Sequence, residues 1–290
     1  MTFTSITDEY TLLNGMKIPC VGFGTWQSAD GQECYNAVTA ALECGYRHID
    51  TAEGYGNEKS VGQAVADFLK TGKCRRPDLF ITTKLHNNEH GYKETQSAIE
   101  KSLADLQLEY IDLFLIHWPN PIKTRAAWQK SNAGSWKAME ESVTDGKIRS
   151  PGVSNFKAHH IDEILKTAKI KPVVNQIKLC PGITQPEVVS FCRSLNIQLE
   201  AYSPMGTGAI FSNGEMKKIA QNHSKTVAQV CIRWSLQNGF LPLPKSVTAE
   251  RIKSNTSVFD FELTENECNI IANLKDTGIV PPRDSDTIQF

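Results

Sequence analysis

The sequence of 290 residues lacks the features that mark several broad classes of protein. Its 31 basic residues are balanced by 32 acidic ones, so nothing favours nucleic acid or another polyanion as a partner. No apolar run is long enough to span a bilayer, and residues 1–5 have neither a basic region nor an apolar stretch. We therefore expect no signal peptide, no membrane partner and a cytoplasmic location.

The sequence also lacks paired cysteine motifs and two common nucleotide-binding motifs. Its eight cysteines are scattered without a C-x-x-C pair, which is typical of reduced cysteines in a cytosolic protein. No Walker A sequence is present, and Gly22-Phe23-Gly24-Thr25-Trp26 breaks the G-x-G-x-x-G pattern that a doubly wound dinucleotide-binding sheet usually carries. Of the two α/β folds considered, a doubly wound sheet and a (β/α)8 barrel, the doubly wound sheet is therefore less favoured.

The sequence does contain an alternation of short apolar segments with amphipathic segments of helical length. In residues 94–106, for example, Ile99, Leu103 and Leu106 share one helical face. The expected strands are residues 19–26, 46–50, 79–84, 111–117, 148–155, 172–179, 197–203 and 240–246. The expected helices are residues 34–44, 58–69, 94–106, 135–145, 161–168, 185–195 and 227–237, followed by 250–255 and 265–274.

Eight strand–helix units in one chain predict an α/β fold, a (β/α)8 TIM barrel that forms a single domain over residues 1–290. Residues 10–18 predict an N-terminal β-hairpin around Asn14-Gly15, and the last helical segment predicts an extra C-terminal helix. No linker or repeat indicates a second domain. Residues 119–134 form the longest connection without a clear pattern, so we expect an irregular loop there that contributes to substrate binding.

Four polar residues lie where separate apolar segments end. Asp50, Lys84 and His117 close the second, third and fourth expected strands, and Tyr55 lies in the loop after Asp50. In a barrel of parallel strands these ends meet at one mouth, where active sites form. An acid, an amine, an imidazole and a phenol that meet there predict a site for proton transfer.

These residues belong to an ordered set of motifs that resembles the aldo-keto reductase family over nearly the whole chain. The motifs are Gly45-Tyr46-Arg47-His48-Ile49-Asp50-Thr51-Ala52, Tyr55-Gly56-Asn57-Glu58, Thr82-Thr83-Lys84, Ile116-His117-Trp118-Pro119, Gly152-Val153-Ser154-Asn155-Phe156, Asn175-Gln176, Ala201-Tyr202-Ser203-Pro204 and Pro244-Lys245-Ser246. Each motif alone is weak, whereas the ordered set is specific. The resemblance, nearest to the bacterial-type branch that includes diketogluconate reductases, implies an oxidoreductase that uses NADPH to reduce aldehydes or ketones to alcohols, and a monomer.

The chemistry of the four residues agrees with this resemblance. Reduction of a carbonyl by hydride requires a proton donor at the oxygen that gains negative charge. A phenol with a pKa of about 10 holds its proton too tightly, and a neighbouring ammonium makes it a better acid. We therefore assign Tyr55 as the acid, Lys84 as that ammonium and Asp50 as the counter-charge of Lys84. His117 is expected to orient the carbonyl or assist the proton as a neutral imidazole.

The resemblance also implies which residues contact the cofactor. Ser154, Asn155 and Gln176 would bond the nicotinamide carboxamide, and Tyr202 would stack on the ring. The other expected contacts from strand ends are Gly24, Thr25, Ser203 and Met205.

A helix start near the end of the chain predicts where the 2′-phosphate of NADPH binds. Backbone N–H groups at such a start bind anions, and Lys245 and Arg251 add positive charge. Together with Ser246 these residues resemble the phosphate site of the family. Asn255 matches a family position near the adenine, although Ser254 stands where relatives often carry Glu.

Aromatic residues at strand ends predict the walls of a substrate pocket, because a carbonyl pocket needs apolar walls around a few polar groups. Trp26 and Trp118 are the expected walls, whereas Trp128 and Trp136 fit either the pocket or the core. His86 stands where relatives commonly carry Trp, which predicts a roomier and more polar pocket on that side.

Two other functions are kept as alternatives. The first is a cofactor-binding redox regulator of the same fold with little turnover. The second is a metal-dependent hydrolase, which requires clustered ligands at strand ends, and only His117 and Asp50 qualify. The favoured hypothesis remains a reductase of a small-molecule carbonyl substrate that needs no metal.

Overall fold

The computed structural model describes residues 3–290; Met1 and Thr2, part of the segment in which we expected no signal peptide, lie outside the described residues. Eight parallel strands form one sheet, in which each strand lies beside the strands that precede and follow it in the chain. Its strands are β3 (Phe23–Gly24), β4 (His48–Asp50), β5 (Phe80–Leu85), β6 (Ile111–Ile116), β7 (Ile148–Ser154), β8 (Val174–Lys178), β9 (Gln198–Tyr202) and β10 (Leu241–Leu243). All eight expected strands are present, most of them shortened by one to four residues at their ends.

Two backbone hydrogen bonds bring the first and last strands together. Gly22 N–H donates to Pro242 O over 3.1 Å, and Gly24 N–H donates to Pro244 O over 3.0 Å. Gly22 must be glycine here, because a Cβ would lie 2.5 Å from His48 Nδ1 and from Leu243 Cδ2. The predicted (β/α)8 barrel is therefore confirmed, while its treatment as a single domain over residues 1–290 stays a prediction.

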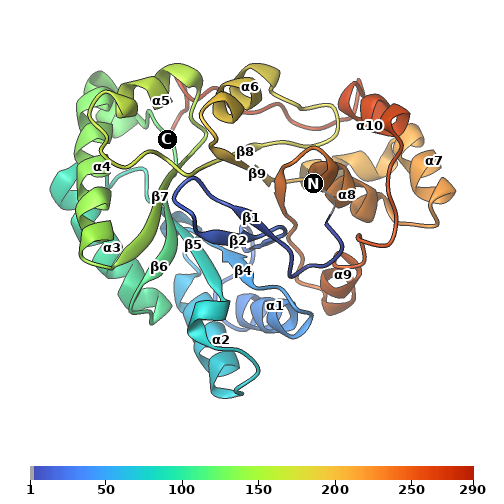
Figure 1. Cartoon of the computed structure of the whole chain (residues 1–290), viewed down its shortest axis with the longest axis horizontal. Coiled ribbons are helices and arrows are strands. Elements are labelled where there is room, and N and C mark those ends of the chain that lie inside the picture. The colour runs from blue at the N-terminus through green and yellow to red at the C-terminus, as the bar shows by residue number, and fades with distance from the viewer. Residues whose placement is uncertain (1–2) are drawn as a thin grey trace.

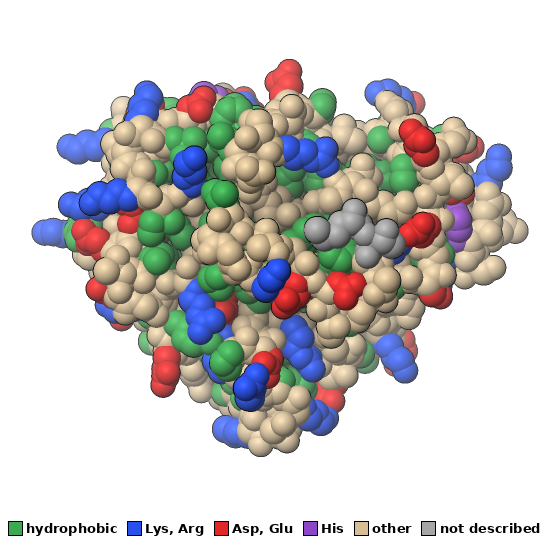
Figure 2. Space-filling view, viewed as in Figure 1, with side chains coloured by type: hydrophobic (Ala, Val, Ile, Leu, Met, Phe, Trp, Pro, Cys, Tyr) green, Lys and Arg blue, Asp and Glu red, His purple; other side chains and the backbone are tan. Residues whose placement is uncertain are grey.

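The helices surround the sheet, as Figure 1 shows. They are α1 (Gln32–Glu43), α2 (Glu58–Lys70), α3 (Tyr92–Leu106), α4 (Trp128–Thr144), α5 (Ala158–Leu165), α6 (Pro186–Ser194), α7 (Gly214–Asn222), α8 (Val227–Gln237), α9 (Ala249–Ser254) and α10 (Glu265–Ala272). In α3 the predicted apolar face, Ile99, Leu103 and Leu106, is buried. Within residues 3–290 no helix is long and apolar enough to cross a membrane. Basic and acidic side chains are interspersed over the face drawn in Figure 2.

The predicted N-terminal hairpin pairs β1 (Glu9–Thr11) with β2 (Lys17–Pro19) and lies across the middle of the barrel in Figure 1. Tyr10 OH donates to the carbonyl of Phe240, just before β10, and Asn14 Nδ2 donates to Ser150 Oγ in the first half of β7. The hairpin therefore covers the N-terminal ends of the strands, opposite the ends that carry the predicted active site.

Two connections differ from the sequence-based expectation. Residues 119–134 were expected to be an irregular loop, but a 3-10 turn, η3 (Ile122–Ala127), runs directly into α4 at Trp128. Asn132 fixes the start of α4, because its Nδ2 donates to Pro119 O over 2.8 Å. The sequence analysis also missed α7, although Asn213 caps it by accepting from Met216 N–H and Met216 and Ile219 are buried at helical spacing.

Candidate active site

A buried ion pair joins the ends of β4 and β5. Lys84 Nζ donates to Asp50 Oδ1 over 2.7 Å, to Asp50 Oδ2 over 2.8 Å and to the carbonyl of Thr51 over 2.7 Å. Both side chains are almost inaccessible to solvent. The three protons of the ammonium are therefore all used, and the ion pair that the sequence predicted is formed.

Tyr55 and His117 lie beside this pair. The rings of Tyr55 and His117 meet edge to face with centroids 5.7 Å apart, and Lys84 Nζ lies 4.9 Å from the centre of the Tyr55 ring. Tyr55 belongs to a short 3-10 turn, η1 (Glu53–Tyr55), whose N–H groups bond back to the loop after β4. The structure thus brings all four predicted catalytic side chains to one place.

Burial and charge act in opposite directions on these groups. Burial raises the pKa of the Tyr55 phenol, and the ammonium of Lys84 only partly offsets this increase. Burial is the largest single influence on Lys84 and opposes its charge, but Asp50 and Tyr55 together outweigh it, so the pKa of Lys84 is raised. Burial and then the Lys84 charge hold the pKa of His117 well below its ordinary value. At neutral pH the site therefore contains a charged amine, a neutral phenol and a neutral imidazole.

The ends of β7, β8 and β9 form a row of polar residues. Ser154 pairs in register with Gln176, and Gln176 pairs with Glu200. Ser154 Oγ donates to Gln176 O over 2.9 Å, whereas Gln176 Nε2 crosses the barrel and donates to Asp50 Oδ2 and to Glu200 Oε2, each over 2.7 Å. The amide nitrogen of Gln176 is fully engaged, so only its Oε1 is left for a ligand.

Asn155 and Tyr202 hold each other at the rim. Tyr202 OH donates to Asn155 Oδ1 over 2.9 Å, and Asn155 Nδ2 donates to His117 O over 3.0 Å. Asn155 has φ 61° and Ser203, next to Tyr202, has φ 50°, a region that non-glycine residues rarely occupy. Strained backbone of this kind clusters at functional sites, so it supports the prediction that these strand ends bind a ligand.

The predicted phosphate-binding residues lie at the end of β10 and along α9, and they differ in exposure. Lys245 and Ser246 are half-buried and Arg251 is exposed on α9, while Asn255 is buried at its C-terminal end. Lys245 Nζ donates to the carbonyl of Gln27 over 3.0 Å, which links the end of β10 to the loop after β3.

Gly24 and Thr25 have other partners in the structure. The Thr25 hydroxyl is buried and donates to Asp50 O over 3.1 Å, and Gly24 approaches β10 so closely that a Cβ would lie 3.3 Å from Leu243 O. Both residues thus position β3 against its neighbours. Met205 is half-buried at the rim, two residues after Ser203.

The expected pocket residues differ in exposure. Trp26 is 46% exposed, whereas Trp118 is 8% exposed and meets Phe290 edge to face at 5.4 Å. His86 is half-buried; its ring packs on Gly54 of η1, and its Nδ1 accepts from Asn88 N–H over 3.1 Å. His86 therefore lies against the turn that carries Tyr55.

The two tryptophans that the sequence left unassigned pack against other residues. Trp136 is 1% exposed and its Nε1 donates to Ile170 O over 3.0 Å, so it belongs to the core between α4 and the segment before β8. Trp128 packs edge to face on His160 of α5, with ring centroids 5.0 Å apart.

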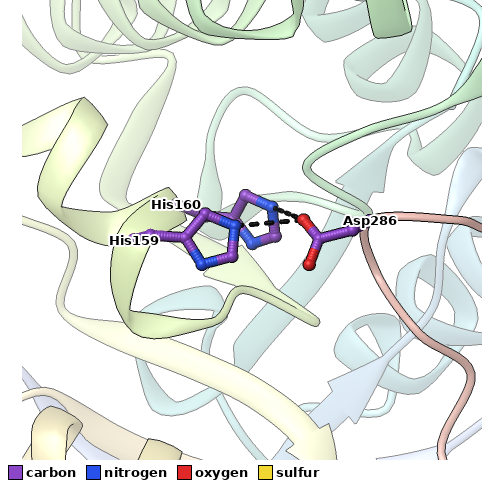
Figure 3. A group of neighbouring side chains, drawn as sticks. All are labelled: His159, His160 and Asp286. Carbon is purple, nitrogen blue, oxygen red and sulfur yellow. Dashed lines mark hydrogen bonds and ion pairs between the residues drawn. The ribbon is translucent and has the colours of Figure 1, made fainter.

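The C-terminal tail, residues 280–290, contacts the candidate site, and no role was predicted for it from the sequence. In Figure 1 the chain ends beside α5. Ser285 Oγ donates to the carbonyl of Asn155, and Phe290 packs on Trp118. Asp286 fastens this segment to α5, because it accepts from Lys157 Nζ over 2.7 Å and lies 3.0 Å from His159 Nε2 and 2.8 Å from His160 Nε2 (Figure 3). The tail thus contacts both a predicted cofactor residue and a predicted pocket wall.

Among residues 3–290, His159, His160 and Asp286 are also the one group of His, Cys, Asp or Glu whose ligand atoms lie close enough to hold a metal ion. Lys157 N–H donates to His160 Nδ1 over 3.1 Å, so a neutral His160 ring carries its hydrogen on Nε2. A metal would need that nitrogen without hydrogen. The group is therefore better described as a polar anchor of the tail, in which Asp286 is hydrogen-bonded to Lys157 and His159.

Glu200 is a buried residue for which the sequence predicted no role. It is fully buried inside the barrel, within the apolar segment that forms β9. A charged residue in the middle of a buried strand was the available signal, because Glu is almost never fully buried unless it is paired.

Comparisons with known proteins agree with this geometry. The family model described as the aldo/keto reductase family matches residues 20–276. A glyoxal reductase of Bacillus subtilis is 44% identical over 282 residues, which cover 97% of this chain and 98% of the relative. An uncharacterised oxidoreductase of the same bacterium is 42% identical over 287 residues, 99% of both chains. A Bombyx mori aldo-keto reductase solved in complex with NADP superposes with a TM-score of 0.84 at 35% identity, covering 91% of this chain and 92% of that one.

Proposed function

This chain belongs to the aldo/keto reductase family, and from this premise we propose that it reduces aldehydes or ketones to alcohols with NADPH, using Tyr55 as the general acid. The observation that carries the proposal is the contact of Tyr55 with both His117 and the buried Lys84–Asp50 pair. The cofactor assignment is supported by the NADP complex of the Bombyx mori relative.

The residues at the strand ends fit a nicotinamide cofactor. Gln176 Nε2 gives both of its protons to carboxyl groups, those of Asp50 and Glu200. Its Oε1 is therefore the atom that can accept a hydrogen bond from a carboxamide. The Tyr202 hydroxyl donates to Asn155, and this bond fixes the Tyr202 ring at the rim. In that position the ring would stack on a bound nicotinamide. NADPH would supply a hydride to the carbonyl carbon. Lys245 Nζ bonds a backbone carbonyl, that of Gln27, and Arg251 is exposed, so both cations would be available to pair with a phosphate.

The chain's own residues account for the proton. Tyr55 would donate its phenolic proton to the substrate oxygen as negative charge develops there. Lys84 stabilises the phenolate that remains, and Asp50 keeps Lys84 charged in a buried position. His117, neutral because of burial, would donate a hydrogen bond to the same oxygen and orient it. Trp118 and Phe290 would exclude water on the side of the tail.

We further propose that small polar carbonyl compounds, dicarbonyls among them, are the preferred substrates. His86 lies against the Tyr55 turn, and an imidazole leaves more room and more polarity there than an indole. The name of the Bacillus subtilis relative, glyoxal reductase, points to the same substrate class.

The test is the variant Tyr55→Phe, which removes the phenolic proton and little else. Its turnover with aldehydes should fall by roughly 10²–10⁴-fold, while NADPH affinity should stay close to that of the parent. Steady-state NADPH oxidation and fluorescence titration of NADPH measure the two effects. Near-normal turnover of the variant would refute the assignment of the acid. A parent protein that binds NADPH but turns over no carbonyl in a panel of aldehydes, ketoaldehydes and sugars would favour the regulatory alternative.

A further inference from the structure

A second buried carboxyl group lies one hydrogen-bonded bridge away from the Lys84–Asp50 pair, and the mechanism above makes no use of it. The two protons of Gln176 Nε2 go to Asp50 Oδ2 and Glu200 Oε2, both at 2.7 Å. Glu200 is inaccessible to solvent. Two carboxyl groups thus share one amide in the closed interior of the barrel.

Among the residues that the structure describes, no lysine or arginine forms an ion pair with Glu200. The Lys84 ammonium spends its protons on Asp50 and on the carbonyl of Thr51. Glu200 Oε1 has no hydrogen-bond partner and lies 4.0 Å from Nε2 of His48. Burial, with a further contribution from Lys84, lowers the pKa of His48 to about 3, so that ring is neutral at ordinary pH. An ionised Glu200 would therefore be an unpaired charge in the interior.

The other titratable groups of the neighbouring elements are directed elsewhere. On β8, Lys178 Nζ donates to Val280 O of the tail. On β9, the Tyr202 hydroxyl donates to Asn155 at the rim. On α6, which packs on the outside of β9, Cys192 contacts Asn175. The strand partner of Glu200 on β10 is Leu241, which is apolar. Asp50 and Lys84 are thus the charges that act on Glu200.

We propose that Glu200 is protonated in the neutral-pH enzyme and acts as a positioning residue that fixes the Gln176 amide, and that its ionisation in alkaline solution lowers the rate of carbonyl reduction. This proposal rests on the proposed function. Two carboxylates that share one site cannot both ionise easily. If Glu200 ionised, a second negative charge would stand beside Asp50. Since Asp50 already raises the pKa of the Tyr55 phenol, a further negative charge would make that phenol a weaker acid.

The direction of the linkage follows from the same geometry. Burial and then the charge of Asp50 raise the pKa of Glu200 to about 8. In the unfolded chain the group would ionise near 4.5, so the folded state holds a proton that the unfolded state releases between these values. The free energy of unfolding that this group contributes is fully present below the pKa of the unfolded state. It is lost as the pH rises through the pKa of the folded state.

The experiment compares the pH dependence of kcat/KM in the parent and in Glu200→Gln, which imitates a neutral carboxyl group. The parent should lose about tenfold per pH unit above the pKa of Glu200, whereas the variant should keep most of the neutral-pH rate and begin its decline at higher pH. Glu58→Gln is the matched control, because Glu58 is also buried but bonds Thr83 rather than Gln176. The control should retain the parent profile.

Identical profiles of the parent and Glu200→Gln would overturn the proposal. So would a Glu200→Gln enzyme that folds but is inactive at neutral pH while Glu200→Asp is active, because that result requires an ionised carboxylate.

A second measurement does not depend on turnover. In protein labelled with ¹³C at the glutamate side-chain carboxyl, the resonance that disappears in Glu200→Gln should report a protonated acid at neutral pH and should titrate in the alkaline range. If Glu200→Gln does not fold, Glu200→Asp assigns the resonance instead. A resonance already ionised at neutral pH would refute the proposal. If no carbonyl is reduced, the proposed function fails, yet the titration still decides the state of Glu200.

Discussion

At one end of the barrel the strands begin under a hairpin that buries apolar side chains, and at the other end the same strands finish in a cluster of buried charges. The hairpin buries Leu12 and Ile18 and needs few polar contacts with the strands below it. At the opposite end Lys84 and Asp50 are buried as ions and Asn155 adopts a strained backbone. Apolar burial stabilises a fold at low cost, whereas buried charge is costly and persists where function requires it. The first end should therefore govern stability and the second activity.

The largest expected effect is that of Lys84→Met, which should reduce both turnover and stability. Turnover should fall by roughly 10²–10⁴-fold because the Tyr55 phenol loses the ammonium that favours its phenolate. Stability should fall by about 3–5 kcal/mol because Asp50 becomes a buried charge without a counter-charge. Urea unfolding and steady-state kinetics measure the two losses. Adding Asp50→Asn should recover stability but not turnover; recovered turnover would contradict the role of Lys84.

At the hairpin end, Ile18→Ala should separate stability from activity. The side chain is fully buried, so its truncation should cost about 2–5 kcal/mol of unfolding free energy. The kcat of the folded variant should equal that of the parent, since the hairpin lies at the far end from Tyr55. Thr11→Ala, an exposed change in the same hairpin, is the control and should leave stability within about 0.5 kcal/mol. A large fall in kcat for Ile18→Ala would break the division between the two ends.

Arg251→Ala should weaken NADPH and spare NADH. A hydrogen bond to a charged phosphate contributes roughly 1.5–3 kcal/mol, which corresponds to a tenfold or larger rise in the dissociation constant of NADPH. Lys253→Ala, which removes another exposed cation from α9, is the control and should have little effect. Fluorescence titration with both cofactors makes the comparison. Equal affinities of the parent for NADPH and NADH would contradict the proposed phosphate site.

The smallest expected effect concerns His86. His86→Trp should shift the ratio of kcat/KM toward an aromatic aldehyde and away from a small dicarbonyl, because the indole would fill space beside the Tyr55 turn. Changes of this kind move such ratios by about 10–200-fold. The ratio for one compound of each kind is measured in parent and variant. An unchanged ratio would leave Trp26, Trp118 and the tail as the determinants of specificity.

Much of the architecture was predictable because it depends on local pattern. The alternation of apolar and amphipathic segments located all eight strands, and α8 has the bounds that its periodicity predicted. The predicted catalytic residues could be located for the same reason: three of them lie at strand ends, Tyr55 lies in the loop after one, and parallel strands end on one side. Residues 119–134 were predicted wrongly because Asn132 bonds the carbonyl of Pro119 and also the His90 ring, 42 positions away, and local pattern does not reveal a helix start that depends on such contacts.

The sequence by itself determined the fold and the identity of the polar groups at the mouth, because both follow from the period of the side chains and the order of the strands. Only the tertiary structure decided which of these groups are paired. Gln176 and Asp50 are joined across the barrel although 126 positions separate them, and Asp286 reaches Lys157 from the far end of the chain. Such contacts depend on the closed curvature of the sheet and on the path of an irregular tail, neither of which has a repeating signature in the sequence. The burial of Glu200 also depends on this curvature, so the charge balance of the site could not be read from the sequence.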